Sequence, residues 1–403
     1  MVLCVPCFSQ PNDFIGQLGL ACPLSSGVYM SLTESDRRLL VEANQLARSS
    51  IVASPPSGSA YCWDAMRKAA GFGLLGTRVA ERSGGLGRSF GFFSALGEAT
   101  ARVDFGFSLA LLNSAGIAAT LEADASPAVR ERLLPGLLSS EHVGCTALTE
   151  PGAGSDASAI STVARKTANG WVINGRKAWI INAAVARVIV VYAQTEPGSG
   201  AKGVASFVID ADRAGFVREP AFDLQAGNNF GLGGFSLQDY VLADEELLHP
   251  PGQAFKYIMG GINGARTYVA AMACGMVTEC LDVARAYGDV RCSFGKPLSE
   301  HQGWRWPLAD AKTDLTAARL LVQRACERID AGEDAQIEAA EAKLFASRMA
   351  ETHIAALEQA MGAEGLRAKH PFGRHQWAAR ATNLVDGSSE MLRERIFASI
   401  RRH

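Results

Sequence analysis

The residues best suited to binding chemistry gather in two short segments of the chain. The segment PGAGSD at 151–156 is a glycine-rich turn, and such a turn lets backbone N–H groups and hydroxyls lie against a planar polar ring. Arg291, Ser293 and Phe294 place a cation, a hydroxyl and an aromatic edge within four residues, a set that suits a dinucleotide tail. Taken alone, PGAGSD could equally be a hairpin turn, and Arg291 a solvated charge at a helix end.

Two further segments carry single residues that could act in a site. NGRKAWI at 174–180 predicts a turn followed by a strand that carries Trp179, which either faces a ligand or packs inside the sheet. VDGSSE at 385–390 precedes an apolar-periodic stretch, so Asp386 could simply cap a helix over 388–401. The seven histidines show no HxxxH or HxH spacing, and the Cys4/Cys7 pair lacks a second pair of ligands. We therefore predict no metal site.

Composition restricts the class of protein. A chain of 403 residues, 48% of them hydrophobic, is long enough for two or three domains. Charged residues make up 20%, and the net charge of −2 gives no reason to expect nucleic acid or an anionic membrane as partner. We find no run of about 18 apolar residues and expect no membrane insertion. The nine scattered cysteines predict reduced, mostly buried thiols and a cytoplasmic location.

The hydrophobic period divides the chain into four parts. Residues 1–29 contain no Lys or Arg, and we expect a leader that is disordered or precedes the natural start at Met30. Residues 30–142 have helical periodicity, with a first helix capped at Ser31 or Thr33. Residues 143–250 consist of short β-branched strands, and residues 251–403 contain long helices. The strands follow one another without intervening helices, and GxGxxG and GxxxxGK[ST] are absent, which argues against a nucleotide-binding α/β domain.

With these elements in place, the motifs resemble one known family. TEPGAGSD at 149–156 closely resembles a signature of the acyl-CoA dehydrogenases, and other landmarks follow the family's order from about residue 33 to the C-terminus. They are SGGLG at 83–87, NGRKAWI at 174–180, RCSFGKPLSEHQ at 291–302, LAD at 308–310 and DGSSEMLR at 386–393. The resemblance implies an α+β multidomain fold: an N-terminal helical domain, a middle β-barrel or sandwich, and a C-terminal four-helix bundle. It also implies FAD and the conversion of an acyl thioester, on CoA or a carrier protein, to a 2-enoyl thioester.

The resemblance further assigns individual residues. It implies contacts to FAD by Leu148, Thr149, Trp179, Ile181, Arg291, Ser293, Phe294, Gln302, Gln359, Gly362, Ser388 and Glu390. It implies contacts to the substrate by Ser155, Gly387 and Arg266, with Arg266 near the pantetheine or phosphate end. In the family, the group around Arg291 reaches the FAD of a neighbouring subunit, so we expect a homodimer or homotetramer. Ile181 stands where the family usually has Thr.

The largest departure from the family is the base. Asp386 occupies the position of the usual Glu, and its carboxylate lies about 1.5 Å further back, about one bond length. A displacement of about 1 Å can cost on the order of 100-fold in rate. The family's alternative Glu position holds Ala265, and we interpret Glu279 and Glu300 as solvated helix residues.

Three interpretations follow from this departure. Either the pocket brings Asp386 to a differently shaped acyl group, as in ring-type members that use Asp, or the chain is an oxidase like the related nitroalkane-oxidising flavoproteins. The third is a binding protein whose catalytic site has decayed. For an enzyme we expect an electron-transfer protein or oxygen as acceptor.

Overall fold

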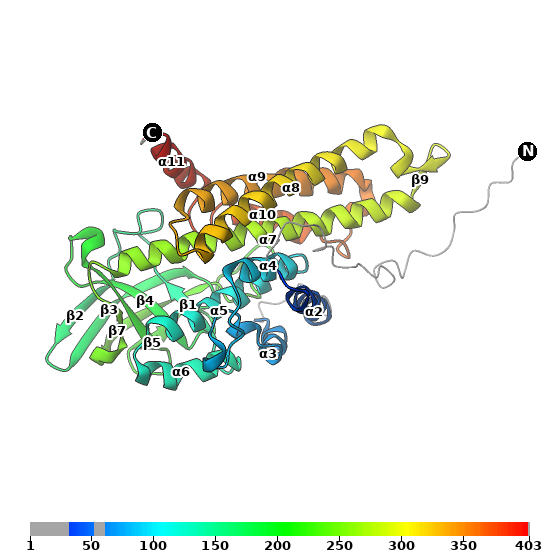
Figure 1. The fold of residues 1–403 in the computed structure, drawn as a ribbon. Helices are drawn as coiled ribbons and strands as arrows, with labels where there is room; N and C mark the ends of the chain where they lie inside the picture. The colour runs from blue at the N-terminus through cyan, green and yellow to red at the C-terminus, as the bar shows by residue number, and fades with distance from the viewer. Residues whose placement is uncertain (1–31, 52–60, 402–403) are drawn as a thin grey trace, which may run out of the picture.

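The computed structural model describes residues 32–51 and 61–401, so the expected leader at 1–29 lies outside the described residues. Figure 1 shows a bundle of long helices, a β-sheet beside one end of the bundle, and the N-terminal helices packed next to both. The predicted fold class, helical then β then helical, is confirmed.

Side-chain caps explain where most of the N-terminal helices begin. The expected cap at Thr33 is confirmed, because its hydroxyl accepts from the Asp36 N–H at 3.1 Å and its own N–H donates to the Asp36 carboxylate at 2.9 Å. Ser89, Asp104 and Ser126 cap the later helices in the same way. The helices are α2 (Glu34–Ile51), α3 (Trp63–Gly71), α4 (Phe90–Ala101), α5 (Phe105–Asp124) and α6 (Pro127–Leu138). Short 3-10 turns lie between α3 and α4, at η2 (Leu74–Gly76) and η3 (Glu81–Ser83).

The middle region folds into one branched sheet. Its strands are β1 (Gly144–Ala147), β2 (Val163–Thr167), β3 (Gly170–Ile180), β4 (Val188–Gln194), β5 (Val204–Asp210), β6 (Phe216–Arg218), β7 (Gly233–Leu242) and β8 (Leu247–His249). The order is β6-β7-β3-β2-β4-β5-β8, and β1 pairs in parallel with β4. Every residue of β4 and β5 is buried, which explains their continuous apolar sequences. Turns η4 (Gly200–Gly203) and η5 (Asp244–Glu246) lie between strands.

The C-terminal region is the helical bundle. It contains α7 (Ala254–Val290), α8 (Gln302–Asp330), α9 (Gln336–Ala360), α10 (Phe372–Thr382) and α11 (Ser389–Ile400), with the two-stranded hairpin β9 (Cys292–Ser293) and β10 (Lys296–Pro297) and turns η6 (Leu298–Glu300) and η7 (Gly362–Leu366). By length and composition α5 and α7 are apolar enough to cross a membrane, but 72% and 83% of their most apolar stretches are buried inside the protein. Their hydrophobicity is therefore accounted for by core packing.

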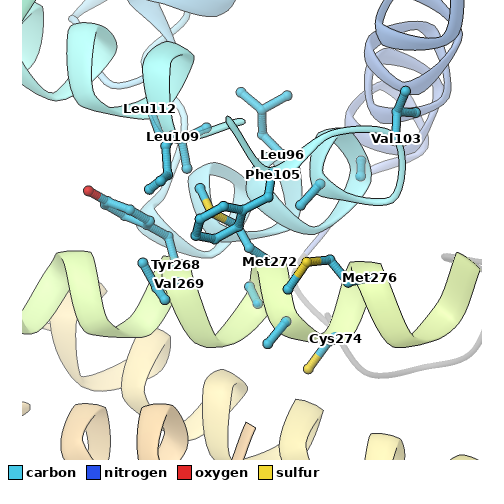
Figure 2. Packing of buried hydrophobic residues seen from close by; sticks show 14 of the residues in the cluster. Leu96, Val103, Phe105, Leu109, Leu112, Tyr268, Val269, Met272, Cys274 and Met276 are labelled. Atoms are coloured by element: carbon cyan, nitrogen blue, oxygen red, sulfur yellow. The ribbon is translucent and has the colours of Figure 1, made fainter. Parts of the chain in front are cut away.

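Small residues bring α4 and α7 into close contact. A Cβ added at Gly275 of α7 would lie 2.2 Å from the carbonyl oxygen of Glu98 in α4, and one added at Gly97 of α4 would lie 3.5 Å from the Met272 side chain of α7. Figure 2 shows Phe105, Leu109 and Met272 filling the space beside this contact, where α4, α5 and α7 meet. The N-terminal domain and the bundle thus share one core.

A buried ion-pair network crosses the same boundary, and it corrects the interpretation of Glu279. This residue is 4% exposed, not solvated, and its carboxylate accepts from Arg48 of α2 at 2.9 and 2.6 Å and from Arg102 at 3.1 Å. Arg102 also binds Asp282 at 2.7 Å. Glu300 is exposed, as expected. Burial raises the pKa of Glu279, but the hydrogen bond and charge of Arg48 and the charge of Arg102 outweigh burial and lower it.

The network predicts the effect of Glu279→Gln on stability. Removing one partner of a buried pair leaves the other charge uncompensated, so we expect the free energy of unfolding in urea to fall by about 3 kcal/mol at neutral pH. Because its pKa is lowered from 4.5, the stabilisation by Glu279 is complete above that pH and is lost as the pH falls through the folded value. The difference between wild type and variant should therefore shrink in acid. Glu300→Gln, an exposed control, should change little; an equal loss there would contradict the assignment.

Candidate active site

Asp386 lies in a strained loop between α10 and α11. Its φ of +54° is unusual for a residue with a side chain, and Gly387 follows with a φ of +104°. Ser388 is the N-cap residue of α11, so the alternative in which Asp386 caps this helix is wrong. Backbone strain of this kind persists only where the surroundings enforce it, and it clusters at functional sites.

Arg266 of α7 holds this loop from the side of the bundle core. Its Nε donates to the backbone carbonyl of Asp386 at 2.9 Å, and its Nη1 donates to Oδ1 of Asn263 at 3.0 Å. A Cβ at Gly387 would approach Nη2 of Arg266 to 3.1 Å, so glycine lets the loop lie against the guanidinium. The expected contact of Arg266 with pantetheine stays a prediction, because the structure places its guanidinium against the loop.

The Asp386 carboxylate keeps an unbonded oxygen in the protein interior, although the residue as a whole is half-buried. Its Oδ2 is buried and has no hydrogen-bond partner among the described residues. Burial raises the pKa of Asp386, and the charges of Lys343 and Arg266 oppose this rise without cancelling it. Burial also raises the pKa of Tyr268, with a further contribution from the charge of Asp386. Figure 2 shows the Tyr268 hydroxyl pointing away from Phe105 and the apolar cluster.

The glycine-rich turn rests on a second buried pair, Glu150 and Lys177. Nζ of Lys177 donates to the Glu150 carboxylate at 2.8 Å and to the Leu148 carbonyl at 2.9 Å. The N–H groups of Ser161 and Thr162 donate to the same carboxylate at 2.6 and 2.9 Å. Burial raises the pKa of Glu150, but Lys177 and these hydrogen bonds outweigh it and lower the pKa to about 2. An ionised, fully bonded pair thus fixes the backbone at Leu148 and Thr149.

The Trp179 side chain is exposed to solvent and is not packed inside the sheet. A register irregularity between Lys177 and Ile180 interrupts the pairing of β3 with β7, and Trp179 has a φ of +60°. Its indole is 59% exposed, and the Phe222 ring lies beside it at 4.5 Å between ring centres. An exposed indole on strained backbone, next to the fixed turn, fits a planar cofactor edge. Ile181 is half-buried against the helical core.

The expected dinucleotide contacts lie at the opposite end of the bundle. Figure 1 shows the β9 hairpin at the far end of α7 from the sheet. Arg291 follows the last residue of α7, about 37 Å from Arg266 at a helical rise of about 1.5 Å per residue. Phe294 is 95% exposed with a φ of +49°. Residues so far from Asp386 fit contacts to the cofactor of another subunit better than contacts within one site.

The other expected site residues lie at or near the surface. Ser388 and Ser293 are half-buried, as are Leu148 and Thr149, whereas Ser155, Gln302, Gln359, Gly362 and Glu390 are exposed. The structure therefore brings Asp386, Gly387 and Arg266 together and leaves the dinucleotide group apart. Among the described residues, no three His, Cys, Asp or Glu side chains are placed to hold a metal ion.

Sequence reasoning missed Glu150, Lys177, Tyr268 and Lys343 as parts of these two clusters. The position of Lys343 in the core could have been predicted from the sequence. It stands at helical spacing from Ala339, Ala346 and Ala350 on the buried face of α9. A lysine at a core position needs a partner, and its ammonium donates to the Gly387 carbonyl. Glu150 lies inside the TEPGAGSD motif but had no role assigned.

Three family profiles match consecutive parts of the chain. They are acyl-CoA dehydrogenase, N-terminal domain, at residues 33–141, the middle domain at 145–240 and the C-terminal domain at 252–400. Together they span nearly all of the described residues.

Individual proteins agree with the profiles. The human mitochondrial short-chain specific acyl-CoA dehydrogenase is 33% identical over 330 residues, 81% of this chain and 80% of that protein. Cyclohex-1-ene-1-carbonyl-CoA dehydrogenase of Syntrophus aciditrophicus (strain SB) is 32% identical over 329 residues, 80% and 79% of the two chains. Butyryl-CoA dehydrogenase from Megasphaera elsdenii superposes with a TM-score of 0.87 at 27% identity, covering 92% of this chain and 99% of that one.

The Glu150–Lys177 pair predicts a defect in cofactor retention. Glu150→Gln leaves Lys177 buried without a counter-charge and loosens the turn at Leu148, so we expect FAD to dissociate at least about tenfold more readily, about 1.4 kcal/mol. The ratio of flavin to protein absorbance after dialysis measures this loss.

Glu219→Gln is the matched control for this prediction. Glu219 binds Arg176, the neighbour of Lys177, in an exposed pair at 2.6 and 2.9 Å. Surface pairs contribute little, so this variant should keep its FAD. Equal retention by both variants would show that the buried pair does not support the cofactor turn.

Proposed function

The chain belongs to the acyl-CoA dehydrogenase family, and we propose that it acts on a compact acyl-CoA, short-chain or alicyclic, with Asp386 as the catalytic base. It is an FAD-dependent oxidoreductase that dehydrogenates an acyl-CoA thioester. The identity of the acyl group and the role of Asp386 are the parts that require experiments.

One observation carries the proposal: the buried Oδ2 of Asp386, without a hydrogen-bond partner among the described residues. A base must present a free lone pair in a dry pocket, where its pKa is raised and proton transfer is favoured. Ala265, at the alternative position for a base, offers no carboxylate. Asp386 is therefore the candidate that fits both requirements.

Proton abstraction, binding of the thioester oxygen and positioning of the loop are assigned to different groups at and around Asp386. Asp386 would take the α-proton as the Cα–Cβ bond becomes a double bond, and FAD, when held beside Thr149 and Trp179, would supply the two-electron acceptor for the β-hydrogen, so atoms and electrons balance. The backbone N–H of Asp386 donates to no acceptor among the described residues, which leaves it available to the thioester oxygen where enolate charge develops. Arg266 keeps the loop in position through the Asp386 carbonyl.

The surroundings of Asp386 favour a compact acyl group. Tyr268 is nearly buried and packs edge to face with Phe93 at 5.8 Å between ring centres, so aromatic rings occupy space near the base. Because Asp is shorter than Glu, the substrate Cα must also come closer to the loop. Relatives named for short-chain and cyclohexene acyl groups are consistent with this preference.

The partners belong to the proposal as well. We propose a homodimer or homotetramer in which Arg291, Phe294 and Gln302 of one subunit contact the FAD bound by another, because these residues are exposed and remote from Asp386. An external electron-transfer protein or oxygen would reoxidise the flavin. Delivery of the acyl group on a carrier protein in place of CoA is an alternative that uses the same chemistry.

Replacing the base tests the central assignment. Asp386→Asn removes the proton acceptor with little change in size, and we expect anaerobic flavin bleaching by acyl-CoA to slow by about 100- to 10,000-fold, the usual contribution of a general base. FAD content should stay unchanged. Glu394→Gln, at an exposed carboxylate of α11, should bleach at the wild-type rate.

The same assay reports the pKa of the base. Asp386 acts only when ionised, and its pKa is raised from 3.8, so the wild-type bleaching rate should fall with acid at a higher pH than an ordinary aspartate would give. Bleaching of the Asn variant at the wild-type rate, with FAD bound, would overturn the role of Asp386.

A substrate panel tests the acyl preference. We expect butyryl-CoA and cyclohexanecarbonyl-CoA, which both carry an α-hydrogen, to bleach the flavin faster than octanoyl-CoA, by at least about tenfold, because even one extra methylene against a closed wall costs about 1–3 kcal/mol. Faster bleaching by octanoyl-CoA would contradict a compact pocket. Bleaching by nitroethane and by none of the thioesters would identify a nitroalkane oxidase, and a protein that refuses FAD would identify a decayed site.

A further inference from the structure

Lys343 of α9 is a buried cation whose hydrogen bond serves the loop of the base. Its side chain is fully buried, on a helix face where Ala339 and Ala346 are its neighbours one turn away. Burying an ammonium group is costly unless it gains strong partners. The acceptor is the backbone carbonyl of Gly387, directly after Asp386, and not a carboxylate.

Lys343 and Arg266 act on consecutive peptide groups. Arg266, from α7, binds the carbonyl of Asp386, and Lys343, from α9, binds the next carbonyl. Both peptides belong to a turn with positive φ at Asp386 and Gly387, and left-handed backbone is unfavourable at a residue that has a side chain, such as Asp386. Two charge-assisted hydrogen bonds from different helices can hold such a turn in place.

The electrostatic surroundings fit a lysine that also acts on the base. Burial lowers the pKa of Lys343 to about 8; the charges of Asp386 on the loop and Glu390 on α11 oppose this, and the charge of Arg266 on α7 adds to it. In return, Lys343 lowers the pKa of Asp386, against the larger effect of burial. Tyr268 is a further titratable group that senses the Asp386 charge.

We propose that Lys343 is a positioning residue for the dehydrogenation: its ammonium group fixes the Gly387 carbonyl and so holds the Asp386 carboxylate in line with the substrate Cα. The inference rests on the proposed function, since it concerns the base assigned there. Lys343 itself need not touch substrate or FAD.

Lys343→Met tests the inference by removing both charge and hydrogen bond. A base displaced by about 1 Å can lose on the order of 100-fold in rate, so we expect anaerobic flavin bleaching by butyryl-CoA to slow by that amount. The dissociation constant of the product crotonyl-CoA, titrated through the flavin spectrum, should change less than about threefold, as should the FAD-to-protein ratio. The acid limb, meaning the pH range in which the bleaching rate falls on acidification, should move to higher pH. The reason is that Asp386 loses a nearby positive charge, which raises its pKa.

Two further variants separate positioning from general stability. Lys343→Arg keeps the charge and the donors, and should return the acid limb to its wild-type pH and recover most of the rate. Ser347→Ala, one turn along α9, removes a buried hydrogen bond of 3.2 Å to Thr382 without touching the loop of the base. It should lower the melting temperature slightly and leave the bleaching rate unchanged.

The outcomes are distinguishable. If wild-type flavin bleaches with butyryl-CoA and Lys343→Met bleaches equally fast with the same acid limb, the positioning role is overturned and the proposed function survives. The positioning role is also overturned if Ser347→Ala slows bleaching as much as Lys343→Met, or if Lys343→Met acts only by losing FAD. If wild type bleaches with no thioester, the proposed function itself fails.

Discussion

The fixation of Asp386 through its own backbone is the interaction on which the site depends. A cation bonded directly to the carboxylate would hold it firmly, but it would also lower its basicity and occupy a lone pair. Here Arg266 binds the Asp386 carbonyl and Lys343 binds the Gly387 carbonyl, so the loop is anchored and Oδ2 stays free of hydrogen bonds from the described residues. Position and reactivity are therefore controlled by different atoms of the same residue.

The cofactor turn uses the same arrangement in the sheet. Lys177 bonds both to the Glu150 carboxylate and to the Leu148 carbonyl, so a buried ion pair controls backbone that we propose contacts the cofactor. The pair itself is buried, whereas the indole of Trp179 is exposed and free to contact a ligand. In both places buried charges support a neighbouring group and are not themselves presented to the ligand.

Much of this architecture could be predicted from sequence. The change from helical to alternating periodicity located the β region, and Thr33 was identified as a cap because capping needs only local residues. Glu279 was misinterpreted as solvated because its partners, Arg48 and Arg102, are distant in the chain. Likewise the motifs pointed to Asp386, whereas the contact of Lys343 with the next peptide depends on how α9 packs against the loop, which no local pattern encodes.

The contact between α4 and α7 has a consequence for how substrate reaches Asp386. Gly275 brings the two backbones together without room for even a methyl group, and the Glu279 network joins α7 to α2 and to Arg102, the C-cap residue of α4. A hinge requires a surface that can separate at small cost, and this surface is neither weak nor loosely packed. We infer that the helical domains do not swing apart during turnover. The thioester therefore enters and leaves through movements of side chains, while the backbones of the helices stay in place.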